Sequence, residues 1–148
     1  MKITKVSLAM LILICAIGIV AAAELSDFKV GEGYTTLKEG SYTNGEESIA
    51  IDIISENDID DLNDAFKNDS DVNYTVESGK LNNTFNFTDE ANDMTGVSEL
   101  VKIKDKNYVI EVWDCSVSGN VTLEKLYDTL EEVNKLNNIE PINPATLD

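Results

Sequence analysis

Histidine and arginine are absent from this 148-residue chain, and lysine is outnumbered by acidic residues. Histidine is the commonest general base near neutral pH and a common metal ligand, so its absence excludes Ser-His-Asp and Cys-His catalysis, His-containing zinc sites and ordinary haem ligation. Without arginine and with few lysines, the chain lacks the clusters that neutralise nucleic-acid phosphates. We therefore expect a protein that is not an enzyme, needs no cofactor and does not bind nucleic acid.

Cysteine is also scarce. Cys15 lies in the apolar N-terminal stretch, so Cys115 is the only cysteine beyond it and no disulfide can form within the folded domain. We expect Cys115 to be a small buried core residue. An intermolecular disulfide is the alternative, and it requires an exposed sulfur.

The N-terminus has the order of features that is typical of a secretory signal peptide. Lys2 and Lys5 provide positive charge, residues 8–20 are apolar, and Ala21-Ala22-Ala23 supplies small residues before Glu24. Residues 1–23 are therefore predicted to be a signal peptide. The 18-residue apolar run 6–23 could alternatively remain as a membrane anchor. Both alternatives predict a secreted or cell-surface, extracytoplasmic protein.

The chain beyond the signal is strongly acidic. Residues 24–148 contain nine lysines and 28 acidic residues, a formal net charge of −19. This charge disfavours anionic membrane surfaces and favours a well-solvated exterior. The length fits a single domain over residues 24–138, and Pro141 and Pro144 indicate an extended C-terminal tail over residues 139–148.

Alternating apolar residues predict strands over 34–37, 41–43 and 48–54. Asn44-Gly45 is a hairpin-turn signal, since both residues tolerate positive φ. Residues 55–58 supply a capping residue and acids for a short helix from Asp58 to about Lys67.

Two further hairpins are expected. Strands 72–77 and 80–87 flank Ser78-Gly79, and strands 97–104 and 107–115 flank Asp105-Lys106. In the first hairpin, we expect Val72, Tyr74 and Val76 to share a face with Leu81, Phe85 and Phe87. The last strand is apolar on both faces, which indicates a central position in a sheet. Glu111 interrupts one of these faces, and Lys102 on the neighbouring strand is its expected cross-strand partner.

A final amphipathic helix is the clearest element. Thr122 can cap it, and its apolar residues recur every three or four positions from Leu123 to Leu136. Strands joined by short turns outnumber helices. The predicted fold class is therefore α+β, an antiparallel sheet built from hairpins with the C-terminal helix and one shorter helix packed on it.

Five Asn-x-Ser/Thr sequons are the most specific functional signal on an exported chain, although richness in asparagine could also produce them. They begin at Asn68, Asn73, Asn82, Asn86 and Asn120. Asn73, Asn82 and Asn86 fall on the polar face of the first predicted hairpin. We expect this face to be exposed to solvent and glycosylated.

Asp69, Asp71 and Asn73 have the spacing of the first three ligands of a helix-loop-helix calcium site. The match then ends, because Tyr74 stands where the turn needs glycine and Lys80 where the bidentate glutamate belongs. These residues predict either millimolar calcium binding or a polar surface turn.

Two other chemistries are open to this sequence. Glu99, Glu111 and Asp114 could supply the two carboxyl groups of a small hydrolase, provided that their separation and pKa values suit. Trp113, the lone tryptophan, could anchor a binding partner, although aromatic residues more often belong to the core.

The segments Gly96–Ile103 and Tyr108–Val112 and the final helix give the chain a pattern that resembles small exported proteins of methanogenic archaea. The order of elements is also similar to PsbP/Mog1-like domains, in which a Gly-aromatic pair precedes the strands. Gly33-Tyr34 occupies that place here, with Glu32 where proline is usual. The resemblance implies an α+β sandwich with an accessory, non-enzymatic role.

The leading hypothesis is an exported domain that engages a surface protein or glycan. A calcium-binding module and a small carboxylate-dependent hydrolase are the alternatives.

Overall fold

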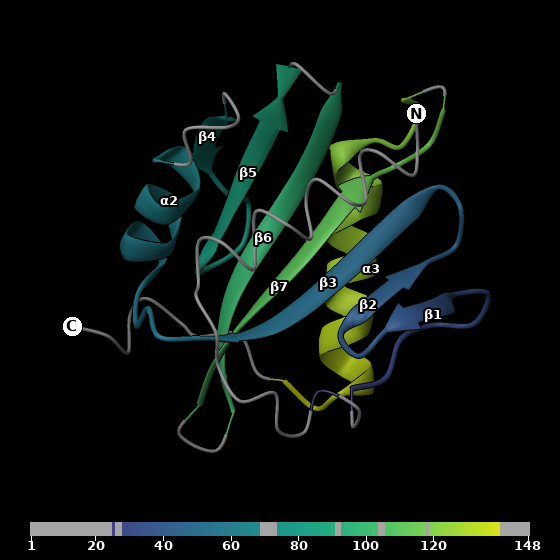
Figure 1. The fold of residues 1–148 in the computed structure, drawn as a ribbon, viewed down its shortest axis with the longest axis horizontal. Coiled ribbons are helices and arrows are strands. Elements are labelled where there is room, and N and C mark those ends of the chain that lie inside the picture. The colour runs from purple at the N-terminus through teal and green to yellow at the C-terminus, as the bar shows by residue number, and fades with distance from the viewer. Residues whose placement is uncertain are drawn as a thin grey trace.

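The computed structural model describes Leu25 and residues 28–68, 74–90, 93–103, 106–117 and 119–139. Seven strands form one antiparallel sheet in the order β1-β2-β3-β7-β6-β5-β4, and two helices pack on it (Figure 1). The strands are β1 (Thr35–Lys38), β2 (Ser41–Thr43), β3 (Glu47–Ile54), β4 (Tyr74–Ser78), β5 (Thr84–Asp89), β6 (Met94–Ile103) and β7 (Lys106–Asp114), and the helices are α2 (Ile59–Lys67) and α3 (Leu123–Leu136). The predicted α+β class is confirmed.

Strand β7 lies at the centre of the sheet, hydrogen-bonded to β3 and β6. Its side chains alternate between two buried clusters. Ile110 and Val112 join the cluster beneath α3, whereas Val109 and Trp113 join the cluster beneath α2. The prediction of a central strand covered on both sides is therefore confirmed, and the two helices lie on opposite faces of the sheet.

Strand β3 follows the same alternation. Ile49, Ile51 and Ile53 face α3, while Ala50 and Ile54 face α2. The strand is joined to β2 at the predicted Asn44-Gly45 turn, where Gly45 has a φ of 92°. The Asn44 side chain closes this turn, since its Oδ1 accepts hydrogen bonds from the backbone N–H groups of Glu46 and Glu47 at 2.9 and 2.8 Å.

Helix α2 begins as the sequence predicts. The Asp58 side chain accepts a hydrogen bond from the N–H of Asp61 at 2.9 Å, which satisfies one free donor of the first turn. Leu62 and Phe66 are buried against the sheet. The Phe66 ring lies 5.3 Å from the Phe85 ring and 5.4 Å from the Phe87 ring, measured between centroids. These aromatic contacts fix α2 over the β4–β6 side of the sheet.

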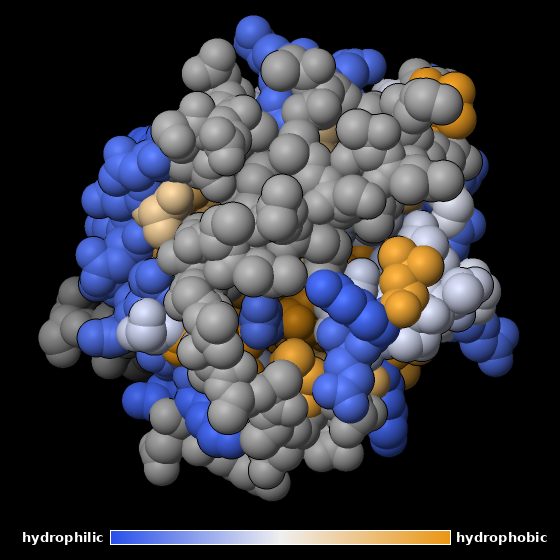
Figure 2. All heavy atoms as spheres, viewed as in Figure 1, coloured by the Kyte–Doolittle hydropathy of each residue, from blue (hydrophilic) through white to orange (hydrophobic). Residues whose placement is uncertain are grey.

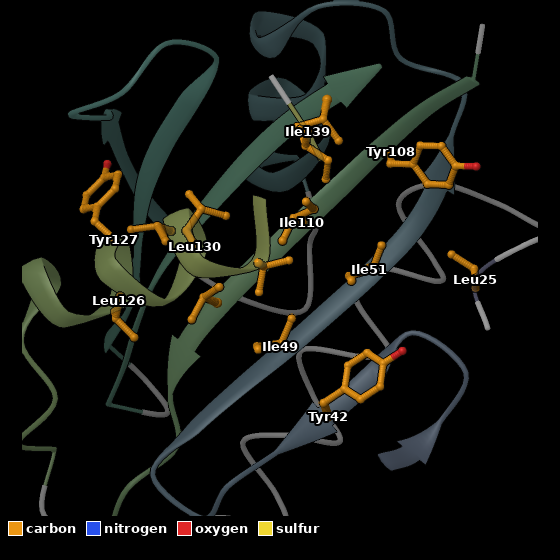
Figure 3. Close-up of a cluster of buried hydrophobic side chains, with 14 of the residues drawn as sticks. Leu25, Tyr42, Ile49, Ile51, Tyr108, Ile110, Leu126, Tyr127, Leu130 and Ile139 are labelled. Atoms are coloured by element: carbon orange, nitrogen blue, oxygen red, sulfur yellow. The ribbon is translucent and has the colours of Figure 1, made fainter. Parts of the chain in front are cut away.

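Helix α3 begins at its predicted cap, where Thr122 accepts a hydrogen bond from the N–H of Lys125 at 3.2 Å. Leu126 and Leu130 of this helix belong to the same buried cluster as Ile49 and Ile110 of the sheet (Figure 3). The segment 28–34 packs against the same cluster. It is tied to the end of the helix, because Lys29 exchanges two backbone hydrogen bonds with the Asn137 side chain at 2.7 and 2.8 Å.

The turn of the first predicted hairpin is longer than Ser78-Gly79. Ser78 pairs with Phe85, and the N–H of Gly79 donates to the carbonyl of Thr84 at 2.9 Å, so residues 80–83 form the loop. The side chain of Thr84 stabilises this loop through hydrogen bonds to the backbone N–H and carbonyl of Leu81. Leu81 therefore packs against the α3-side cluster, and the prediction that it shares a face with Phe85 was wrong.

Ile139, predicted to open an extended tail, is buried in the α3-side cluster. Its N–H donates to the carbonyl of Asn134 at 2.9 Å. The folded domain thus includes Ile139. Residues 140–148 lie outside the described part of the chain, as do Asp105 of the second predicted turn and the predicted signal peptide.

Gly96 gives a test of the packing beneath α2. A Cβ atom added there would lie 2.2 Å from Cζ of Phe87, whose ring is fully buried. We expect Gly96→Ala to lower the free energy of unfolding by about 1–3 kcal/mol through overpacking, as measured by urea denaturation. In a Phe87→Leu background the same methyl group should cost less, so equal costs in the two backgrounds would contradict this packing.

Candidate functional site

Several carboxyl groups are buried in the sheet, in a chain that has no histidine or arginine to neutralise them. Glu47, Glu99, Glu111 and Asp114 each have less than a twentieth of their surface exposed. A buried carboxylate without a cation is costly, and burial raises the pKa of Glu47, Glu99 and Glu111. Each of the four accepts a hydrogen bond from an uncharged group of the chain itself.

Glu111 lies on the α2 side of β7, between Ala50 of β3 and Ser98 of β6. Burial raises the pKa of its carboxyl to about 8, although the contact with Ser98 lowers it slightly. Ser98 Oγ donates to Glu111 Oε2 at 3.4 Å. The expected pairing with Lys102 is wrong, because the register places the exposed Lys102 opposite Asn107, four residues along β6 from Ser98.

Glu99 lies on the opposite side, beneath α3. Asn134 Nδ2 donates to Glu99 Oε2 at 3.2 Å. Burial raises the pKa of the Glu99 carboxyl to about 7, the bond from Asn134 lowers it, and the negative charge of Glu131 raises it. This glutamate therefore changes its charge within the physiological range.

Glu47 makes the second carboxyl contact with α3. Thr129 Oγ1 donates to Glu47 Oε1. Burial raises the pKa of Glu47, while the Thr129 contact and the nearby charge of Lys125 lower it. Tyr34 also hydrogen-bonds Thr129, and burial together with the charge of Glu47 raises the pKa of its hydroxyl to about 12.

Tyr127 makes a third polar contact between α3 and the sheet. Its hydroxyl donates to Asn86 Oδ1 of β5 and accepts from the N–H of Lys80 at 2.8 Å. Together, Tyr127, Thr129 and Asn134 link α3 to β5, β3 and β6. We call these three contacts the helix–sheet polar contacts. The sequence analysis missed them, although Thr129 and Asn134 fall within the helical stripe of buried positions.

The carboxyl groups considered for hydrolysis do not form a facing pair. Glu99 and Glu111 lie on opposite faces of the sheet. Asp114 is held at the end of β7, where its carboxylate accepts hydrogen bonds from Ser116 N at 2.7 Å and Val121 N at 3.3 Å. This acid orders the loop that leads into α3.

Trp113 is completely buried in the α2-side cluster. Its ring is part of the core, which favours the core alternative, and a role as a partner anchor stays a prediction. Cys115 is buried in the same cluster as predicted, and Ser48 Oγ donates to its Sγ at 3.1 Å. Neither the Trp113 ring nor the Cys115 thiol is exposed to solvent.

The predicted glycosylation sites have different environments. Asn68, Asn82 and Asn120 are exposed, Asn73 lies outside the described residues, and Asn86 is half-buried beneath Tyr127. The polar face of the first hairpin is thus partly covered by α3 instead of open to solvent throughout. Glycosylation itself stays a prediction, most readily accommodated at the exposed asparagines.

Asp69, Asp71 and Asn73 of the predicted calcium site lie outside the described residues. Elsewhere in the described ranges, no three side chains of histidine, cysteine, aspartate or glutamate are grouped to hold a metal ion. The helices in these ranges also lack the length and apolar character needed to cross a bilayer.

Comparisons of the chain with family models, with curated proteins and with solved structures give no match. Its chemistry is therefore inferred from its own residues, among which the buried glutamates are the most unusual feature.

The raised pKa of Glu111 predicts how stability depends on pH. The folded state favours the protonated form of Glu111. The stabilisation that this group provides is therefore complete below about pH 4.3, the ordinary pKa of glutamate, and is lost as the pH rises through about 8. We expect the free energy of unfolding to fall by up to ~1 kcal/mol per pH unit between pH 5 and 8 on account of this group. Urea denaturation at several pH values measures it.

Glu111→Gln should flatten this pH dependence, because a carboxamide keeps the shape and stays neutral. The matched control is Glu77→Gln, at an exposed position of the edge strand β4. If both variants kept the slope of the unaltered protein, Glu111 would not be the buried acid responsible.

Proposed function

We propose that this chain is an exported, non-enzymatic accessory module that binds another protein at the cell surface. Export is supported by the charged, apolar and small-residue segments of residues 1–23. A binding role is supported by the way acidic residues divide between interior and surface. The buried carboxyl groups are hydrogen-bonded within the protein. The acidic residues on the surface are therefore the ones available to another molecule.

The observation that carries the proposal is the acidity of both helical layers. On α2, Asp60, Asp61 and Asp64 are exposed, with Lys67 as the basic residue of the helix. Figure 2 shows hydrophilic residues along the side of the molecule where α2 lies. This concentration of negative charge favours a positively charged partner. Complementary electrostatic potentials accelerate association, and acidic competitors are repelled.

Helix α3 presents a second acidic surface on the opposite side of the sheet. Its exposed acids are Glu124, Asp128, Glu131 and Glu132, interspersed with Lys125 and Lys135. Because two lysines dilute the charge of α3, α2 has the higher density of negative charge. We therefore assign the partner contact to the outer face of α2, and the partner is a protein with a lysine- or arginine-rich surface.

Binding of the purified protein to native cell envelopes tests this proposal. We expect saturable binding that weakens roughly tenfold when salt is raised well above physiological strength. Replacing Asp60, Asp61 and Asp64 by asparagine should abolish most of the binding without unfolding the protein, because all three side chains are exposed.

Replacing Glu124 by glutamine and Asp128 by asparagine provides the matched control on α3, and this variant should bind almost normally. Binding that is not saturable, or that survives both high salt and the α2 replacements, would contradict the proposal.

A further inference from the structure

The contact between Glu99 and Asn134 leaves two polar atoms without partners. Asn134 Nδ2 donates to Glu99 Oε2, but Glu99 Oε1 and Asn134 Oδ1 have no hydrogen-bond partner among the described residues, and both atoms are buried. A buried polar atom without a partner costs about 1–3 kcal/mol. Two such atoms in one contact therefore call for a physical explanation.

A single proton accounts for both atoms. An ionised carboxylate only accepts hydrogen bonds, and Oδ1 of a carboxamide also only accepts, so the two oxygens would repel each other. A protonated carboxyl group instead has one O–H donor. With the proton on Oε1, Glu99 can donate to Asn134 Oδ1 while its Oε2 accepts from Asn134 Nδ2.

We propose that Glu99 is a protonated carboxylic acid that forms a reciprocal, two-bond pair with the Asn134 carboxamide, and that loss of this proton releases α3 from the sheet. The pair lies within the interface between β6 and α3, where Glu99 and Asn134 are almost fully buried. This inference is independent of the proposed partner binding.

Among the described residues, the group that compensates for a negative charge on Glu99 is the Asn134 N–H, and no cation acts on this carboxyl group. Its ladder neighbours are Thr84 on β5 and Ile110 on β7, which are uncharged. The charged group that acts on it from α3 is Glu131, which opposes ionisation. Once Glu99 loses its proton, it faces the lone pairs of Asn134 Oδ1 and the like charge of Glu131, so both changes favour separation of the helix.

The same interface contains a second acid, which responds in the same direction. Glu47 accepts from Thr129 in the middle of α3, and burial raises the pKa of Glu47. Lys125 on α3 and Glu46 on the chain before β3 are the charged residues that act on it, with opposite effects. Lys125 moderates the response of Glu47, so Glu99 is the principal switch.

Amide hydrogen exchange of α3 between pH 5 and 9 in the full protein, corrected at each pH for the intrinsic exchange rate, tests this switch without any mutation. If opening of α3 exposes Glu99 to water, its carboxyl group has the ordinary pKa of about 4.3 in the open state, against about 7 in the closed state. The protection of α3 should therefore fall by up to about tenfold per pH unit between pH 5 and 7 and level off above pH 7. Protection of α3 that does not change between pH 5 and 7 would overturn the proposal.

Glu99→Gln provides the decisive variant. Its carboxamide can accept from Asn134 Nδ2 and donate to Asn134 Oδ1 at every pH, so the protection of α3 should lose most of its pH dependence, and only the smaller response of Glu47 should remain. Glu111→Gln, the same replacement on the opposite face of the sheet, should retain the tenfold change. Persistence of the change in Glu99→Gln, or its loss only in Glu111→Gln, would show that Glu99 is not the switch.

Discussion

The structure depends on one constraint, which is the cost of removing carboxyl groups from water. These groups lie in a sheet that is covered on both sides. With no histidine or arginine in the chain, Glu99 and Glu111 have only neutral hydrogen-bond donors within reach. Desolvation then dominates over every other effect on their pKa values. We infer that both glutamates hold a proton in the core, one on each face of the sheet.

The architecture explains why Glu99 and Glu111 are similarly buried but affect different parts of the structure when they ionise. Strands β6 and β7 are central, so both of their faces are buried and a glutamate on either face is removed from water. Glu111 is bonded to Ser98 within the sheet, and its ionisation acts on the stability of the whole domain. Glu99 is bonded to Asn134 across the boundary between sheet and helix, so its ionisation acts first on the docking of α3.

Much of the fold could be predicted from the sequence because the local signals agree with the tertiary structure. The alternation in β3, the Asn44-Gly45 turn, and the caps Asp58 and Thr122 all lie where sequence patterns place them. The apolar residues on both faces of β7 correctly indicated its central position. The helix–sheet polar contacts could not be found in this way, because they join residues that are more than 30 positions apart.

Two errors about single residues share a cause. The pairing of Lys102 with Glu111 rests on strand adjacency alone, and the actual register differs by four residues. The placement of Leu81 on the face of Phe85 rests on alternation alone, whereas Leu81 lies in the loop of residues 80–83 and packs against the α3-side cluster. Register and the depth of burial are properties of the assembled sheet, which a local pattern specifies only weakly.

The central claim is that the core glutamates are protonated at neutral pH. The most direct measurement is a titration of the side-chain carboxyl carbons by NMR, with Glu99 and Glu111 assigned individually. The account predicts midpoints near 7 for Glu99 and near 8 for Glu111. Midpoints for both core glutamates below about 5 would mean that they are ionised in the folded protein, and would contradict the account.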